Sequence, residues 1–434
     1  MQNNLVVDVQ IWGNLVGALA WDESSDCAVF EYDPHFARSG LNLAPLVMPP
    51  SPGRTYSFPE NKNRCFKGLP GLVADSLPDD FGTQIIREWF VAQGYSLSEV
   101  TPLESLCYMG KRSMGALEFE PSKKNAELDT FSRIYVDDLV RMANDILAKR
   151  CDFKTMLMQD DKSLYDILRV GTSAGGAKPK AIIAYNEKTG EVRSGQVEAP
   201  QDFGYWLLKF DGAKFSEHDS ITEIPKGIGA VEYAYYRMAI LAGIQMSESR
   251  LLKDGSSRHF MTRRFDRTDD GQKIHMQTLS ALAHYDRDAR HSYEEVFLIM
   301  QRLGLDNESL RQMYRRAVFN IMARNNDDHA KNISFLMDKN GKWSLAPAYD
   351  ICYSHNPDSR WINKHQMSLG GKCEEHSLKD LENLAQFVGI RHFAEIIEQV
   401  REAVSRWSEL AKDCDVRKHH IAEIEKNLLY GMLK

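Results

Sequence analysis

The segment NNDDHAKN, residues 325–332, brings together side chains that can carry out chemistry, at a spacing that such chemistry requires. Asp327 and Asn332 have four residues between them, and the apolar residues on either side predict a buried helix before the segment and a buried strand after it. A carboxylate in this loop can accept a proton from an attacking hydroxyl group or orient that group. An amide oxygen a short distance later can face a magnesium ion, because magnesium prefers oxygen ligands. The segment therefore predicts a site for metal-assisted group transfer.

A second carboxylate is expected beside this loop. The sequence ISFLM, a DKNG turn and the sequence KWSLAPAYD predict a β-hairpin over residues 333–346, and Asp350 follows its second strand. Protein kinases have the same order of an Asp-x4-Asn loop, a hairpin and a metal-binding aspartate, which lies in a DFG motif. Here AYDIC replaces DFG, but the carboxylate is present. This order predicts Asp327 as the proton-accepting or orienting group, with Asn332 and Asp350 facing a metal ion.

Other parts of a kinase nucleotide site occur upstream in the kinase order. Residues 171–180, GTSAGGAKPK, form a loop of small residues before a strand, which suits the approach of backbone N–H groups to phosphates. Lys209 in the strand WLLKF could reach the α- and β-phosphates, and Glu232 near the start of a helix could pair with it. Residues 259–266, HFMTRRFD, would serve as the hinge against adenine. The interpretation as a nucleotide site rests on the order of these parts along the chain, because each part alone is a weak signal.

Ordinary structural interpretations exist for each of these residues. A small-residue loop is often only a turn, Lys209 could extend from a sheet edge towards water, and Glu232 could be a surface residue that complements the helix dipole. His329 could bind a metal or could orient the loop through backbone hydrogen bonds. Asp328 could be a third metal ligand or could cap a turn.

The elements that must position these residues change in type along the chain. Alternating apolar residues predict strands over the first forty residues, a helix is expected after Asp79-Asp80, and a polar stretch lies near 120–130. Strands then predominate up to a hairpin around Asp254-Gly255, and helices predominate from about residue 276 onward. We predict a β-rich N-terminal domain over residues 1–125, a second β-containing domain over 126–264, and a helical domain over 265–434.

Composition limits the class of protein. The 434 residues are 43% hydrophobic and 26% charged, as in ordinary globular proteins, and no apolar run approaches the length of a membrane span. The first residues lack the basic and apolar regions of a signal peptide, so we expect a cytoplasmic location. The seven cysteines include no close pair, which favours free thiols in a reducing compartment. A net charge of -7 argues against nucleic-acid binding over the whole surface.

Several motifs together resemble a known family. SLPDDFGTQII, SAGGAKPK, HFMTRRFDR, IHMQTLSAL, VFNIMARNNDDHAKNISF and LAPAYDI are similar to the successive signatures of the HipA family, the serine/threonine kinase toxins of bacterial HipBA toxin–antitoxin modules. The resemblance extends from the N-terminal strands to about residue 354.

The resemblance implies an α+β, kinase-like two-lobed fold with an extra N-terminal subdomain, together with ATP and Mg²⁺ as cofactors. It matches Asp327 to the catalytic aspartate, and Asn332 and Asp350 to the magnesium ligands. The residues expected to bind the nucleotide are Ser173, Ala174, Gly175, Gly176, Ala177, Lys178, Lys180, Lys209, Glu232, Phe265, His329 and Lys331.

Ser173 falls where the family carries an autophosphorylated serine. A phosphate on Ser173 would add nearly two negative charges beside the expected position of the ATP phosphates. Repulsion between these charges should pull the loop out of its ATP-binding conformation. The resemblance therefore implies that autophosphorylation switches the kinase off.

The family also implies partners. These are a small HipB-like helix-turn-helix antitoxin, operator DNA that is contacted chiefly through the antitoxin, and a protein substrate that in one family member is an aminoacyl-tRNA synthetase. An alternative is a catalytically weak, kinase-fold regulatory module that binds an antitoxin–DNA complex. A phosphoesterase or nuclease built on Asp-Asp-His would need further metal-binding motifs, and none is found in the sequence. A lipid kinase would be expected to carry a basic amphipathic helix for the membrane surface, and none is apparent.

Overall fold

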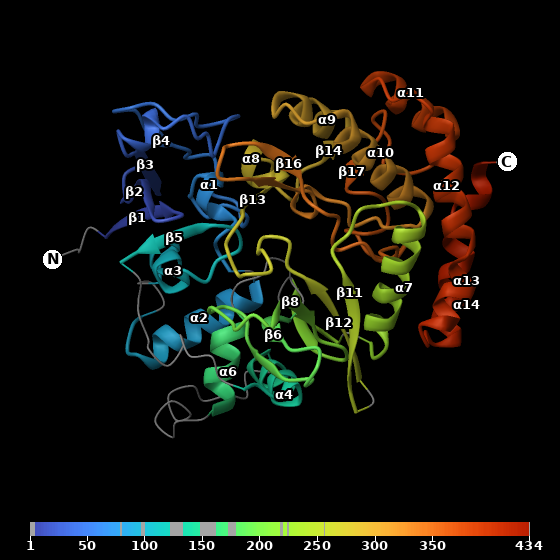
Figure 1. The fold of residues 1–434 in the computed structure, drawn as a ribbon, viewed down its shortest axis with the longest axis horizontal. Helices are drawn as coiled ribbons and strands as arrows, with labels where there is room; N and C mark the ends of the chain where they lie inside the picture. Colours follow the sequence, from blue (N-terminus) through green and yellow to red (C-terminus); the bar gives the residue numbers. More distant parts are fainter. Residues whose placement is uncertain are drawn as a thin grey trace. The chain divides into compact units, whose positions relative to one another are not determined.

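The computed structural model describes residues 5–78, 80–96, 100–121, 133–147, 162–171, 179–217, 220–223, 225–255 and 257–433. The chain forms two compact units. Figure 1 labels the helices and strands of the chain. The first unit contains residues 1–226, 252–277 and 337–341, and the second contains residues 227–251, 278–336 and 342–434. The three domains expected from the sequence remain a prediction.

The first unit begins with a five-stranded antiparallel sheet in the order β4-β3-β2-β1-β5. Its strands are β1 (Val6–Ile11), β2 (Asn14–Asp22), β3 (Cys27–Tyr32), β4 (Thr55–Ser57) and β5 (Leu117–Glu120). Val7, Val9 and Ile11 alternate along β1 and are fully buried, as the period of two in the sequence predicts. The short helices between these strands are η1 (Phe36–Arg38), α1 (Gly71–Ala74), α2 (Asp80–Ala92) and α3 (Pro102–Met109).

A second sheet follows, in the order β11-β12-β8-β6-β7. Its strands are β6 (Lys180–Tyr185), β7 (Val192–Ser194), β8 (Gly204–Lys209), β11 (Ser249–Asp254) and β12 (Ser257–Arg263). Other elements between residues 133 and 278 are α4 (Val136–Leu147), α6 (Lys162–Val170), the two-stranded pair β9 (Lys214–Glu217) and β10 (Ser220–Glu223), and β13 (His275–Thr278), which belongs to a separate sheet. Helices α4 and α6 pack on each other, and Trp206 and Leu208 of β8 are buried in this part of the core.

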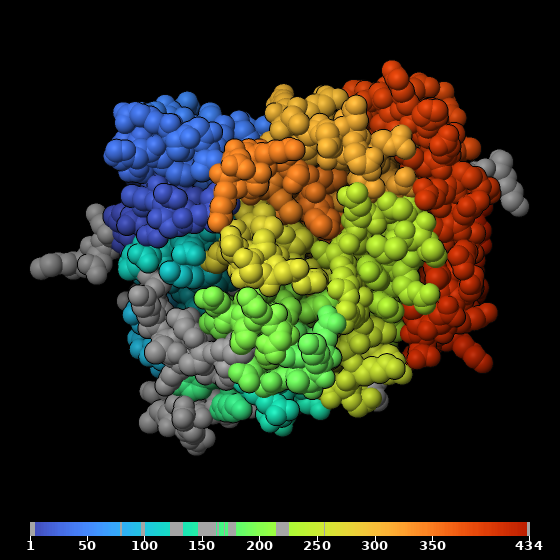
Figure 2. Space-filling view, viewed as in Figure 1, coloured from blue at the N-terminus to red at the C-terminus, as the bar shows by residue number. Residues whose placement is uncertain are grey.

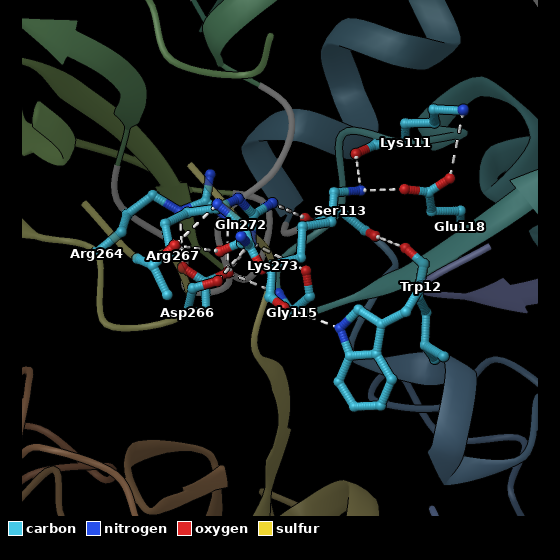
Figure 3. A network of polar contacts seen from close by, with 12 residues as sticks. Trp12, Lys111, Ser113, Gly115, Glu118, Arg264, Asp266, Arg267, Gln272 and Lys273 are labelled. Atoms are coloured by element: carbon cyan, nitrogen blue, oxygen red, sulfur yellow. Dashed lines mark hydrogen bonds and ion pairs between the residues drawn. The ribbon is translucent and has the colours of Figure 1, made fainter. Parts of the chain in front are cut away.

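A buried ionic network ties the segment after β12 to the N-terminal sheet (Figure 3). The Asp266 carboxylate accepts hydrogen bonds from Arg264, from Arg267 and from the Gly115 amide at 2.6–2.9 Å. Burial opposes ionisation of this carboxyl group, but the charges of the two arginines outweigh burial and hold the pKa of Asp266 well below its usual range. The network therefore fixes the chain that leaves β12.

A second set of bonds lies beside this network (Figure 3). Lys273 Nζ donates to Glu118 at 2.9 Å and to the Lys111 carbonyl at 2.7 Å, and Trp12 Nε1 donates to the Lys273 carbonyl at 2.8 Å. These contacts join residues more than 150 positions apart in the sequence.

The second unit is mainly helical. Its elements are α7 (Ile228–Leu241), α8 (Leu279–Ala283), β14 (His291–Ser292), α9 (Tyr293–Arg302), α10 (Asn307–Met322), η3 (Ala330–Asn332), β15 (Ser334–Met337), β16 (Trp343–Leu345), β17 (Met367–Ser368), α11 (Leu378–Val388), α12 (Phe393–Ser405), α13 (Trp407–Asp413), α14 (Lys418–Asn427) and η4 (Tyr430–Leu433). Helix α10 packs against α12, and α7 packs against α13. The helices between residues 378 and 427 form a continuous face of this unit (Figure 2). None of the helices in the described ranges has the length and apolarity needed to cross a membrane.

Replacing Asp266 by alanine should destabilise the protein strongly, because two buried guanidinium groups would lose their shared carboxylate. We expect a loss of about 3–5 kcal/mol in the free energy of unfolding, measured by urea titration at pH 7. Asp269→Ala is the matched control, because Asp269 is 90% exposed and pairs with Arg263 at the surface. The control should cost no more than about 1 kcal/mol.

The loss of unfolding free energy in Asp266→Ala should depend on pH in a defined direction. The pKa of Asp266 is lower in the folded than in the unfolded chain. The ionised carboxylate therefore stabilises the fold at any pH above the pKa of the unfolded chain, and this stabilisation is lost as the pH falls towards the folded pKa. The gap between wild type and Asp266→Ala should shrink below about pH 4. Equal losses from Asp266→Ala and Asp269→Ala would contradict the role given to the network.

Candidate active site

Helix α10 delivers the chain to the predicted catalytic loop. The helix starts at the N-cap Asp306, whose side chain accepts the Ser309 amide at 2.8 Å. At its other end the Ala323 carbonyl accepts a hydrogen bond from the buried Tyr235 hydroxyl at 2.8 Å, and Arg324 adopts a left-handed backbone with φ +54°. The chain therefore leaves the helix through a fixed turn.

The loop itself is closed by its last residue. Asn332 Nδ2 donates to the Asp327 carbonyl at 2.7 Å, and the Asn332 amide donates to the His329 carbonyl at 2.9 Å. A carbonyl oxygen only accepts hydrogen bonds, so the atom of Asn332 that faces it must be the NH₂ group. The amide oxygen of Asn332 is then the end that remains to face a ligand.

Asp350 reaches the same part of the second unit from the end of the hairpin. It follows β16 with φ +55°, a backbone conformation that is uncommon for a residue other than glycine, and its side chain is exposed. Asn332 and Asp350 both line one small cavity that is open to solvent, and its wall also contains Arg316, Asn320 and other residues of α10 and the loop. The two predicted metal ligands therefore lie on one cavity.

Asp327 lies close by but is not among the residues that line this cavity. Its side chain is 39% exposed, and its Oδ1 lies 3.6 Å from Nε2 of the buried His329. Burial lowers the pKa of His329, whereas the charges of Asp327 and Asp350 act in the opposite direction. Both carboxylates are thus near enough to the His329 ring to interact with it electrostatically.

Asp328 has a different environment from its neighbour. Its buried carboxylate accepts the Tyr293 hydroxyl at 2.6 Å, His365 Nδ1 at 3.0 Å, the Gln366 amide at 2.8 Å and the Met367 amide at 3.1 Å. Burial and the charge of Asp328 together raise the pKa of Tyr293, so its hydroxyl stays a donor. From the sequence, Asp328 could be either a metal ligand or the cap of a turn. In the structure it anchors the segment 365–367 to the loop.

Lys331 has its main chain fixed in place. The Tyr349 hydroxyl, just before Asp350, donates to the Lys331 carbonyl at 2.7 Å and lies 2.5 Å from the Ser334 hydroxyl. This contact connects the two ends of the hairpin and so sets the distance between the loop and Asp350. The Lys331 side chain itself is half-buried.

The predicted phosphate-binding lysines belong to the first unit. Lys180 of β6 and Lys209 of β8 are directly opposite in the antiparallel register, so their side chains share one face of the sheet. Phe260 is the next residue across the sheet, and Lys209 Nζ lies 5.7 Å from the centre of its ring. Two lysines side by side on one face would suit the binding of an anion.

The remaining predicted nucleotide-binding residues are placed as follows. Phe265 is half-buried in the segment after β12. Glu232 in α7 is 7% exposed, which excludes the surface position considered from the sequence. Ser173, Ala174, Gly175, Gly176, Ala177 and Lys178 lie outside the described residues.

The residues present fit a magnesium ion in their chemistry. Asn332 and Asp350 offer one amide oxygen and one carboxylate, the hard oxygen donors that Mg²⁺ prefers, and Mg²⁺ is commonly held by one or two carboxylates together with substrate phosphates and water. Within the described ranges, no group of three or more His, Cys, Asp or Glu side chains is placed to hold a metal ion. A nucleotide would therefore have to supply part of the coordination.

The sequence did not single out several residues that build this site. Arg316 and Tyr293 are buried against it, and Tyr349 and His365 hold its segments. Arg316 carried a signal that could have been used, because a charged residue at a core position of a helical pattern is unusual. His365 carried none, because it is remote from the loop in sequence.

Asp327 and Asp328 should respond differently to the same substitution. Asp328→Asn should lower the free energy of unfolding by about 3 kcal/mol, because charge-assisted bonds to buried donors are lost. Asp327→Asn should change it by no more than about 0.5 kcal/mol, since the side chain is partly exposed. Urea titration of both variants tests this, and an equal loss of stability would refute the division of roles.

Comparison with known proteins agrees with this geometry. The HipA-like C-terminal domain matches residues 172–407, and the HipA N-terminal domain matches residues 7–120. A protein from Haemophilus influenzae that is named as a kinase is 24% identical over 250 residues, which cover 54% of this chain and 66% of that protein, just under two thirds of its length.

The fold has a solved counterpart. The HipA structure from Shewanella oneidensis, determined with HipB and operator DNA, matches 98% of this chain and 96% of its own, with a TM-score of 0.64 and 16% identity. The expected α+β, kinase-like two-lobed fold is therefore confirmed. With both domains matched in order, the chain belongs to the HipA family.

Proposed function

We propose that this chain is an ATP- and Mg²⁺-dependent protein serine/threonine kinase of the HipA toxin type. The main support for the proposal is that Asn332 and Asp350 line one cavity, while Asp327 belongs to the same loop as Asn332 and is bonded to it through its carbonyl. In this proposal Asn332 and Asp350 hold Mg²⁺, which neutralises charge on the phosphates when it is bound. Asp327 orients the attacking hydroxyl group and accepts its proton.

The nucleotide-binding residues follow the sequence prediction. Lys180 and Lys209 are assigned to the phosphates, supported by their adjacent positions on one face of the sheet. Glu232, Phe265, His329 and Lys331 complete the described part of this set, and the small-residue loop 172–178 is assigned to the phosphates on the sequence alone. Ser173 in that loop is proposed as the site of self-inactivating autophosphorylation.

The partners in this proposal follow from the family. The Shewanella relative was solved with HipB and operator DNA, so a HipB-like helix-turn-helix antitoxin is the proposed partner here. DNA contact would be made chiefly by the antitoxin, in keeping with the net charge of -7. The proposed substrate is a protein hydroxyl group, for which an aminoacyl-tRNA synthetase is one candidate, and the proposed location is the cytoplasm.

A regulatory role without catalysis is the second candidate. A kinase-fold module that only binds an antitoxin–DNA complex would not require an oriented metal-facing amide or an exposed carboxylate beside it. Calorimetry that shows no nucleotide binding, together with normal antitoxin binding, would favour this alternative.

The kinase proposal predicts a specific pattern of labelling. The purified full chain, incubated with γ-labelled ATP and Mg²⁺, should incorporate phosphate at Ser173, located by mass spectrometry. Asp327→Asn should reduce the rate by about 100-fold or more, because the group that accepts the proton is removed. Asp338→Asn, in the exposed turn that follows β15, is the matched control and should label at the wild-type rate.

Two further results test the assignments of Ser173 and Asp327 separately. Ser173→Ala should remove the self-labelling but keep transfer to other proteins in a cell extract. Wild-type labelling in the Asp327→Asn variant would defeat the assignment of Asp327, even if nucleotide binding were retained.

A further inference from the structure

Arg316 carries a buried positive charge in the second unit. The residue is 5% exposed, and within the described ranges no carboxylate forms an ion pair with it. Burial lowers the pKa of its guanidinium group to about 10. An isolated buried charge is costly, so its position requires a specific explanation.

The guanidinium group is directed at the chain that leads to Asp350. Arg316 Nη2 donates to the Ala346 carbonyl at 2.7 Å, at the end of β16. Arg316 also lines the cavity shared by Asn332 and Asp350, and its Nε has no hydrogen-bond partner among the described residues. The side chain thus lies between α10 and the proposed metal ligands.

Gln312, one helical turn before Arg316, is connected to the same segment through Gln245. Its Oε1 accepts the Gln245 amide at 3.0 Å, and its Nε2 donates to the Gly243 carbonyl at 3.1 Å. The Gln245 carbonyl in turn accepts the Ala348 amide at 2.8 Å. Residues four positions apart lie on the same face of a helix, so both side chains of α10 act on the segment 346–348.

This fixation matters because Asp350 adopts an unfavourable backbone. A left-handed conformation at an aspartate persists when the surrounding structure determines it. The Ala346 amide donates to the Ser334 carbonyl at 3.0 Å, which leaves the Ala346 carbonyl to Arg316. Without the guanidinium group, that carbonyl would lose its buried donor and the segment would have fewer constraints two to four residues before Asp350.

We propose that Arg316, supported by Gln312, is a positioning residue that fixes Asp350 relative to Asn332 for metal binding. The inference rests on the proposed function, because it assumes that Asn332 and Asp350 bind a divalent cation. Methionine is unbranched and apolar and can replace the aliphatic part of the Arg316 side chain, but it is shorter and has no donor for the Ala346 carbonyl. The contribution of Arg316 is therefore its hydrogen bond to the segment, which substitution can remove while packing is largely retained.

The test uses the full chain and two readouts that do not depend on phosphoryl transfer. Mn²⁺ affinity is measured by electron paramagnetic resonance in the presence of a non-hydrolysable ATP analogue. Amide hydrogen exchange of the peptide 343–350 is measured by mass spectrometry in metal-free protein. The variants are Arg316→Met, Arg316→Lys and Gln312→Leu. Arg311→Met is the matched control, because Arg311 lies on the same helix and donates to the Arg391 carbonyl at 3.0 Å on the exposed side.

Arg316→Met should weaken Mn²⁺ binding by about 10- to 100-fold, the range typical of residues that orient metal ligands, and should accelerate exchange in 343–350. Arg316→Lys should recover part of the affinity, because an ammonium group can still donate to the Ala346 carbonyl. Arg311→Met should match wild type. If Arg316→Met does not fold, Gln312→Leu decides the question and should show a smaller change in the same direction.

A folded Arg316→Met variant with wild-type Mn²⁺ affinity would overturn the proposal, whatever its exchange rates. Weaker Mn²⁺ binding with unchanged exchange would also overturn it, because Arg316 would then act through its charge and not by holding the segment. Absence of kinase activity in a wild-type protein that binds Mn²⁺ would defeat only the proposed function. Failure of the wild type to bind Mn²⁺ with the analogue would defeat both.

Discussion

The hydrogen bond from the Asn332 amide to the Asp327 carbonyl is the constraint on which the rest of the site depends. It closes the loop between α10 and β15, and it determines which end of the Asn332 side chain is available to a ligand. The loop lies next to a packed helix, where unpaired backbone groups would be costly. The residue that satisfies the loop backbone is therefore also the residue that presents an oxygen to the cavity.

Four aspartates of this protein form two pairs with different surroundings. Asp266 and Asp328 are buried among several donors and hold distant parts of the chain together. Asp327 and Asp350 are at least partly exposed and lie close to His329. Buried carboxylates that are saturated with hydrogen bonds serve the fold, whereas exposed carboxylates on fixed backbone can bind a substrate or a metal.

The sequence predicted the elements that local patterns specify. Helix α7 ends before Gly243, whose φ of +77° favours glycine, and the hairpin that leads to Asp350 has its expected position. The sequence also drew attention to the loop 325–332 through its density of polar residues between apolar elements. It did not predict that Asp328 would bond His365, or that Arg316 would bond Ala346, because these contacts join residues 30 or more positions apart. Long-range partners of this kind have no local signature. The assignments of Ser173 to Lys178 lie outside the described residues and remain predictions.

The central claim is that the oxygens of Asn332 and Asp350 bind one divalent cation together with a nucleotide. Titration calorimetry of Mg²⁺ into the full chain, saturated with a non-hydrolysable ATP analogue, tests this claim most directly. We expect one strong site in the wild type and an affinity at least about 10-fold weaker in both Asn332→Ala and Asp350→Asn. Wild-type affinity in either folded variant would contradict it.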